Sequence, residues 1–289
     1  MASLVQIAVN GLAQGSIYAL MALAIVVIYN TTETFNFAQG EFVLLAAYVS
    51  ASLMGIIPWY LAMLVAVAVI ALFGATVFQR VVYWPLRNAT FEFVIVSTLG
   101  VGLFLRNMVK IIWGAIARPY PEYFGGVWRV AGVSIVKQHV LILAMTGGLI
   151  LLFYLFMMKT TVGAMMRATA QNKRAATLMG IKVSQMVALT YFFAALLGSV
   201  AGILVAPIFF LTIDMGMATM TKGFAATIVG GFGSIPGAIV GGLLLGLVEA
   251  FATAFISPVY KDAYTFVALL AILVFLPRGI FGERIAEKV

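Results

Sequence analysis

The sequence contains no cysteine and one histidine, His139, among 289 residues. It therefore offers no disulfide, thiolate metal site or cysteine nucleophile, and one histidine excludes a metal or haem site built from several. Only 9% of the residues are charged, against about 25% in soluble domains, while 64% are hydrophobic. Such a chain cannot fold as a water-soluble globule, so we expect a membrane protein without catalytic residues, metal or cofactor.

Long uncharged stretches predict an all-α polytopic membrane protein. No charged residue lies between Glu41 and Arg80 or between Lys182 and Asp214, and each stretch exceeds the ~20 apolar residues that a spanning helix needs. Their uniformly apolar character, without alternation, argues against a barrel. We predict one transmembrane domain over 1–289 with about eight spanning helices. These helices lie near 5–29, 41–57, 59–79, 92–113, 139–158, 185–206, 236–256 and 262–277.

A further apolar stretch, 223–233, is shorter than a spanning helix and is rich in glycine, which predicts a half-helix or re-entrant segment. The loop 159–184 carries basic residues and no acidic residue, so we predict that it is cytoplasmic. That orientation places the N-terminus and the loop 114–138 outside. An even number of crossings would leave the C-terminal tail outside, against its basic charge. A short additional crossing near 223–233 would resolve this conflict.

A few polar residues lie inside predicted spans, where they are costly and therefore informative. Asn10 and Gln14 are four residues apart and share a helix face, so they either line a translocation path or form hydrogen bonds between helices. Glu249 is either solvated at the end of its span or faces a water-filled cavity. Arg106 and Lys110, near the outer end of their helix, are expected to extend their charged groups to the membrane surface.

A dense polar segment, residues 30–41, separates the first two predicted helices. It includes Asn36 and Gln39, with Gly40 suited to a turn and Glu41 to the positive end of the next helix dipole. An ordinary helix start would explain the segment. We favour a structural corner at the edge of a cavity, because so many hydrogen-bonding side chains gather there.

The loop 159–184 is predicted to form short amphipathic helices that end at Gly180. They either anchor the chain to anionic lipid headgroups or dock a cytoplasmic partner, and the small residues favour docking. The chain has no phosphate-binding Gly-x4-Gly-Lys-Ser/Thr motif. Any ATP must therefore be hydrolysed by a partner.

The external loop 114–138 contains two short β-type segments, 127–130 and 133–136, separated by Ala131 and Gly132. This pattern predicts a small hairpin. The hairpin either docks something from outside or covers helix ends.

Four segments carry a resemblance to a known family. Together with the loop residues Ala175, Leu178 and Gly180, they resemble the permeases of branched-chain amino acid ABC importers of the LivH type, in the family's order and over nearly the whole chain. Many relatives are expected to have histidine at the position of Gln39, which weakens a mechanism that needs a titrating group there. The segments are 10–24 (NGLAQGSIYALMALA) with 35–41 (FNFAQGE), 163–168 (GAMMRA), 230–242 (GGFGSIPGAIVGG) and 276–282 (LPRGIFG).

The resemblance implies one permease domain in the plasma (inner) membrane of a bacterium or archaeon, embedded in membrane lipid. It implies a heterodimer with a second related permease, two cytoplasmic ATP-binding subunits and an external solute-binding protein, and no nucleic-acid partner. The loop 159–184 becomes the ATPase-coupling loop. Expected coupling residues are Gly163, Arg167, Ala168, Ala175, Leu178 and Gly180. Expected substrate-pathway residues are Asn10, Gln14, Asn36, Gln39 and Glu249.

Two other classes remain as alternatives. The first is an autonomous ion-gradient-driven transporter or channel for small polar solutes, with Glu249 or Asp214 as the coupling carboxylate. A membrane enzyme is the second. The scarcity of acidic residues in the spans argues against the first, and the lack of a convergent set of catalytic residue types argues against the second. The sequence does not distinguish branched-chain amino acids from urea, amides or aromatic acids as the transported solute.

Overall fold

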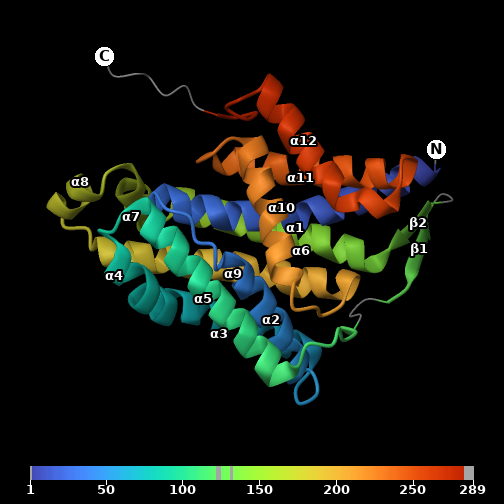
Figure 1. Ribbon diagram of the computed structural model, residues 1–289, viewed down its shortest axis with the longest axis horizontal. Helices are drawn as coiled ribbons and strands as arrows, with labels where there is room; N and C mark the ends of the chain where they lie inside the picture. Colours follow the sequence, from blue (N-terminus) through green and yellow to red (C-terminus); the bar gives the residue numbers. More distant parts are fainter. Residues whose placement is uncertain (1, 122–124, 131–132, 283–289) are drawn as a thin grey trace.

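The computed structural model describes residues 2–121, 125–130 and 133–282. These residues form a bundle of helices with one small β-hairpin at one end (Figure 1). The predicted all-α membrane fold is confirmed. The elements are α1 (Ala2–Thr32), α2 (Gln39–Leu53), α3 (Trp59–Phe73), the π-helix η1 (Gly74–Tyr83), α4 (Trp84–Leu86), α5 (Phe91–Trp113), β1 (Val127–Val130), β2 (Val133–Val136), α6 (Lys137–Lys159), α7 (Thr161–Gln171), α8 (Lys173–Leu178), α9 (Val183–Phe209), α10 (Met215–Gly230), α11 (Ile235–Phe255), the 3-10 turn η2 (Pro258–Tyr260) and α12 (Lys261–Phe275).

Seven helical segments of the described chain are long and apolar enough to cross a membrane. They are α1, the continuous run α3–η1–α4, α5, α6, α9, α11 and η2–α12. The predicted span 41–57 is instead the 15-residue helix α2, most of whose residues are buried. A helix of this length falls short of the ~20 residues that cross a bilayer. Because α2 is surrounded by other helices, its apolar sequence reflects burial in protein and does not require lipid around it.

The short glycine-rich segment is longer than predicted. The expected half-helix at 223–233 belongs to α10, which has 16 residues and begins at Met215. At ~1.5 Å per residue this helix is about 24 Å long. Because Lys222 interrupts the apolar pattern, the sequence did not indicate the first half of this helix, residues 215–222. The helix ends at Gly231, whose φ of 104° favours a residue without Cβ.

In Figure 1, α10 lies across the middle of the bundle, at a steep angle to α1. Like α2, it is shorter than the ~20 residues that cross a bilayer, and it is not among the seven segments of the described chain that are long enough to do so. The additional crossing near 223–233 therefore stays a prediction. The Phe281 amide donates a hydrogen bond to the Gly230 carbonyl, 2.9 Å away, at the end of α10. The basic tail residues Arg284 and Lys288 lie outside the described residues.

Small residues allow α1 and α11 to pack closely. A Cβ on Gly15 would lie 2.8 Å from the Gly242 carbonyl oxygen, and one on Gly11 would lie 3.0 Å from that of Gly246. Because hydrophobicity does not drive helices together in lipid, close backbone contact of this kind stabilises the bundle. The glycine pairs spaced by four residues in these two helices therefore serve internal packing.

Two sets of three helices, α1–α2–α3 and α9–α10–α11, make reciprocal contacts. Helix α2 lies against α9, where Gly202 meets the backbone of Val43, while α10 lies against α1, where Gly223 meets Met21. The first turns of α2 and α10 meet at Gly40, where a Cβ would lie 2.7 Å from the Gly216 carbonyl oxygen. The sequence contains no convincing repeat, so these reciprocal contacts are visible only in the structure.

The predicted hairpin is confirmed for its strands. β1 and β2 are antiparallel, with Val127 opposite Val136 and Val130 opposite Val133. The predicted turn at 131–132 lies outside the described residues. The hairpin lies at the opposite end of the bundle from α8 (Figure 1).

Candidate functional site

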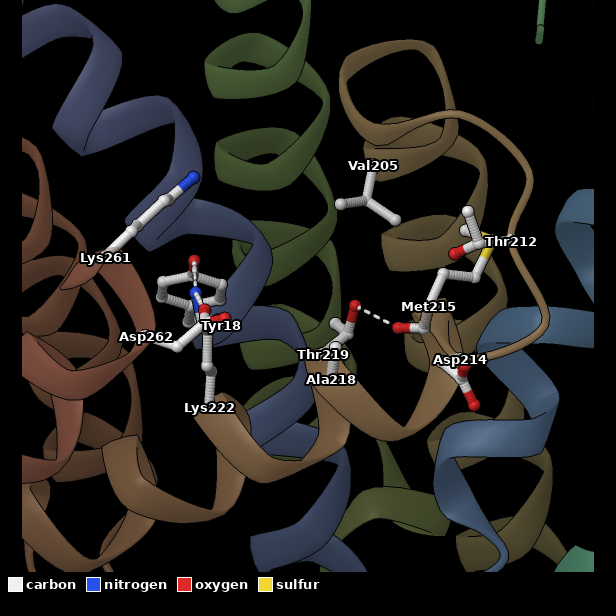
Figure 2. Close-up of a pocket in the computed structure, with 10 residues that line it drawn as sticks. All are labelled: Tyr18, Val205, Thr212, Asp214, Met215, Ala218, Thr219, Lys222, Lys261 and Asp262. Atoms are coloured by element: carbon white, nitrogen blue, oxygen red, sulfur yellow. Dashed lines mark hydrogen bonds and ion pairs between the residues drawn. The ribbon is translucent and has the colours of Figure 1, made fainter. Parts of the chain in front are cut away.

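A cavity of about 290 Å³ lies among α1, α9, α10 and the start of α12. Figure 2 shows the charged and phenolic side chains of α1, α10 and α12 together on one side, and Val205 and Met215 on the other side with Thr212 and Asp214. Its two sides therefore differ in chemistry. The lining residues are Tyr18, Val205, Thr212, Asp214, Met215, Ala218, Thr219, Lys222, Lys261 and Asp262.

A buried ion cluster underlies the charged side of this cavity. Glu249 of α11 is completely buried, and the Lys222 ammonium lies 2.9 and 3.0 Å from its two carboxylate oxygens. The Tyr18 hydroxyl donates to both oxygens at 3.1 Å, and the Thr265 hydroxyl donates to one at 2.8 Å. Three donors, one each from α10, α1 and α12, thus surround one carboxylate, and Lys261, the first residue of α12, lies 3.4 Å away. Glu249 is not a solvated residue at the end of a helix.

Lys222 also connects this buried carboxylate to the cavity. Its ammonium lies 2.8 Å from Asp262, whose side chain is 81% exposed. The two lysines, Lys222 and Lys261, balance the carboxylates of Glu249 and Asp262, so the cluster carries no net formal charge. Neutrality matters because an uncompensated charge in a low-dielectric site costs several kcal/mol.

A second ion group lies beside the first. Arg106 of α5 contacts Glu41 at 3.0 Å and Asp214 at 3.6 Å. The expectation that Arg106 reaches out to the membrane surface is wrong, because Glu41 holds it between α2 and α5. A second hollow of about 490 Å³ is lined by Arg106, Lys110, Thr212 and Asp214 among others. Thr212 and Asp214 line both hollows, so the two adjoin at the loop before α10.

The amides singled out in the sequence do not line the charged cavity. Asn10 and Gln14 are half-buried on α1. Gln39 is completely buried and donates to the Ala194 carbonyl of α9 at 2.7 Å, whereas Asn36 accepts from the Ala38 amide at 3.0 Å. Within the described residues, Asn36 Nδ2 and Gln39 Oε1 have no hydrogen-bond partner. Of the five expected pathway residues, only Glu249 contacts the residues of the cavity.

The segment 30–41 forms a compact corner between α1 and α2. Phe35 stacks on Tyr29, with ring centroids 5.0 Å apart, and contacts Phe224 and Phe232 at 5.4 and 5.5 Å. The Asn30 amide donates to the Gly233 carbonyl at 2.8 Å. The corner therefore ties the end of α1 to the turn between α10 and α11.

Sequence reasoning missed Lys222, Lys261 and Asp262. Lys222 is a basic residue inside an otherwise apolar segment, and Glu249 is a carboxylate inside another. A buried charge in a membrane protein needs a partner, so this pair was detectable. No local signal connects Asp262 to the pair, because an acidic residue in the first turn of a helix is ordinary.

The loop 159–184 forms the two short helices expected of it. Thr160 caps α7 by accepting from the Gly163 amide at 3.0 Å, and Asn172 caps α8 by accepting from the Ala175 amide at 3.0 Å. Gly180 follows α8 with a φ of 82°, as a glycine after a helix does. The amphipathic helices and their end are confirmed.

The six expected coupling residues fall into two groups. Gly163 is buried, because a Cβ there would meet the backbone of Phe156 and Met157, and Arg167 and Ala168 are half-buried on α7. The remaining three form an exposed group at and just after α8. They are Ala175, Leu178, which is 90% exposed, and Gly180.

Polar contacts join this loop to α1. The Lys173 ammonium donates to the Thr32 carbonyl at 3.3 Å, at the negative end of the α1 dipole. On the neighbouring turn, the Thr190 hydroxyl of α9 donates to the Thr31 hydroxyl at 3.1 Å. The α1 helix thus connects α8 to Tyr18 in the ion cluster.

Comparison with known proteins gives consistent matches. The family described as "Branched-chain amino acid transport system / permease component" matches residues 7–276. The chain is 33% identical to the high-affinity branched-chain amino acid transport system permease protein LivH of Escherichia coli (strain K12), covering 97% of this chain and 96% of that one. It is 33% identical to BraD of Pseudomonas aeruginosa over the same shares, and 29% identical to a probable LivH of Methanocaldococcus jannaschii, covering 92% of this chain and 89% of that one.

Proposed function

The chain belongs to the family of branched-chain amino acid transport system permease components, and on this basis we propose that it carries branched-chain amino acids or closely related small solutes inward across the membrane. The observation that carries the proposal is the match to such permeases over 97% of the chain. The chain is a multi-pass membrane subunit of a transporter. Its membrane is the plasma (inner) membrane of a bacterium or archaeon.

ATP is bound and hydrolysed by two cytoplasmic partner subunits, and an external solute-binding protein delivers the substrate. A second, related permease completes a heterodimer. The docking interpretation of the loop 159–184 is favoured over a lipid anchor by its exposed apolar side chains. Leu178 and Met179 are 90% and 79% exposed beside small residues, which suits a groove on a protein partner.

The loop transmits motion through two connections. Gly163, Arg167 and Ala168 seat α7 on the bundle, and Lys173 connects α8 to the end of α1. A rigid-body shift of α7 and α8 would therefore move α1 and open the path alternately to each side. Asn10, Gln14, Asn36 and Gln39 are proposed to line or border that path. Glu249 acts beside it as a fixed counter-ion.

The autonomous ion-coupled transporter is disfavoured by family membership. It is also disfavoured by the position of its proposed carboxylate, because Glu249 is completely buried and paired with Lys222. A coupling carboxylate has to exchange its ion or proton with water. Asp214, the other candidate, is 87% exposed but is held near Arg106.

Reconstitution tests the proposal. Proteoliposomes that contain both permeases, the ATP-binding subunits and the solute-binding protein are expected to accumulate radiolabelled L-leucine only when ATP is supplied. Omitting the ATP-binding subunits alone should abolish this accumulation. Uphill uptake by the chain alone, driven by a proton or sodium gradient, would refute the assignment.

A further inference from the structure

We propose that the cavity beside Lys222 binds the zwitterionic headgroup of the transported amino acid during its passage. In this site Asp262 accepts from the ligand ammonium, while Lys261 donates to the ligand carboxylate. The inference rests on the proposed function, because it assumes an amino acid as the solute. It adds a binding site and two ligand-contacting residues.

The size and the division of the cavity fit such a ligand. Its volume of about 290 Å³ lies near the lower end of the range of small-molecule sites, roughly 300–1,000 Å³. Figure 2 shows Val205 and Met215 across the cavity from Lys222 and Asp262. An amino acid whose charged end lies at the ion cluster would therefore place an aliphatic side chain near the apolar side chains of Val205 and Met215.

The charge of the cluster selects for a neutral ligand. Two ammonium groups, of Lys222 and Lys261, balance two carboxylates, of Glu249 and Asp262. A zwitterion adds one charge of each sign and leaves the balance intact. A ligand with net charge would leave one charge uncompensated beside the completely buried Glu249, which is costly. The cluster therefore distinguishes leucine from lysine and glutamate without contacting their side chains.

The four charged side chains differ in how exposed they are, and this difference distinguishes those that can contact a ligand from those that only stabilise the cluster. Glu249 is completely buried and its two oxygens are occupied by Tyr18, Thr265 and the lysines, so it serves as an internal counter-ion. The Asp262 side chain is 81% exposed and Lys261 is 24% exposed, and both line the cavity. Both side chains therefore offer exposed surface to a ligand in the cavity.

Access to the cavity comes from the hairpin end of the bundle. Asp262 lies at the start of α12, and Asp214, which is 87% exposed, lies in the loop between α9 and α10. Asp214 also borders the neighbouring hollow beside Arg106 and Lys110. A solute released at this end of the molecule would therefore reach the charged cavity before it passes farther along α10.

Equilibrium binding to the assembled transporter in nanodiscs, without the solute-binding protein and without ATP, tests the inference. Radiolabelled L-leucine is expected to bind saturably. Leucinamide, which lacks the carboxylate, and 4-methylpentanoate, which lacks the ammonium, should each compete at least about tenfold more weakly, because each loses a charge-assisted hydrogen bond. Lysine and glutamate should also compete weakly.

Charge-altering variants add a result that a purely structural role would not produce. Asp262→Asn is expected to weaken leucine binding about tenfold or more and to shift preference toward 4-methylpentanoate. Lys261→Gln should shift preference toward leucinamide. Glu92→Gln and Lys137→Gln, which alter charges away from the cavity, serve as matched controls and should bind leucine as the unmodified protein does.

The two proposals fail in different ways. The site is refuted if the unmodified transporter shows no saturable leucine binding, if the headgroup-deleted analogues compete as well as leucine, or if the variants weaken binding without the opposite shifts in preference. The first two outcomes do not depend on a variant, because the competition is measured in the unmodified protein. The proposed function fails instead if the complete system shows no ATP-dependent uptake of leucine, or if the chain alone takes up leucine on an ion gradient.

Discussion

Replacing Lys222 by methionine is expected to cause a large loss of stability. The change keeps the length of the side chain but removes the ammonium that lies 2.9 and 3.0 Å from the Glu249 carboxylate. Glu249 is completely buried, so it cannot recover a water molecule in place of its partner. Only Tyr18, Thr265 and the more distant Lys261, at 3.4 Å, remain to compensate its charge.

The magnitude follows from the cost of an uncompensated buried charge. Breaking a buried ion pair by removing one partner costs about 3–5 kcal/mol. Because Lys261 remains, we expect the lower end, a decrease of about 3 kcal/mol in the free energy of unfolding. Asp262 adds little to this loss, since its side chain is 81% exposed and water replaces the ammonium.

A second substitution isolates the cause. In Lys222→Met/Glu249→Gln no unpaired charge remains in the core, so the double variant should be more stable than Lys222→Met alone by about 1 kcal/mol or more. Lys137→Met, at the start of α6, is the matched control and should change stability by less than about 0.5 kcal/mol.

The measurement is denaturant-induced unfolding of the full-length chain in detergent micelles, followed by tryptophan fluorescence. The double-mutant cycle compares the two single variants, the double variant and the unmodified chain. If Lys222→Met and the double variant are equally unstable, the loss comes from packing and not from the charge of Glu249. That result would refute the electrostatic explanation of the cluster.

Three further predictions concern coupling and packing. Leu178→Glu should lower co-purification of the ATP-binding subunits, measured by affinity purification, because it places a charge on an exposed apolar contact; unchanged co-purification would favour a lipid anchor. Lys173→Met should lower ATP-dependent leucine uptake several-fold while ATP hydrolysis persists, because it removes the contact between α8 and Thr32; equal losses in both assays would contradict transmission through this contact. Gly15→Ala should destabilise the bundle by about 1–3 kcal/mol, because its Cβ would lie 2.8 Å from a carbonyl oxygen of α11. Gly147→Ala is the matched control: nothing lies within 4 Å of a Cβ at this position, so the variant should unfold as the unmodified chain does.

Interactions between distant helices explain where sequence-based expectations were wrong. Arg106 was expected to reach the membrane surface, but its guanidinium lies 3.0 Å from Glu41. Residues 41–57 were expected to span the membrane, but α2 has 15 residues and lies among other helices. In both cases the local pattern is the same for contact with lipid and for contact with protein. Only the position of the neighbouring helices distinguishes them.

The candidate site was partly detectable. Glu249 was identified because a carboxylate in an apolar helix is costly and therefore informative. Its principal partner, Lys222, lies in a helix whose first half was not among the predicted segments, since a lysine and nearby threonines lower its hydropathy. Gln39 was also identified, but it donates to the α9 backbone and lies in the helix packing. Whether it borders the substrate path stays a prediction.

The sequence alone determined that this chain is a helical membrane protein with a basic loop of two short helices and a small hairpin. These features follow from composition, apolar length and capping residues, which act over a few neighbouring residues. The tertiary structure alone decided that Lys222, Glu249 and Asp262, from three different helices, meet beside one cavity. It also decided that α2 and α10 are short helices whose first turns meet. Such contacts depend on how glycine-lined helices pack against each other, and no local pattern encodes the partner that a buried charge will find.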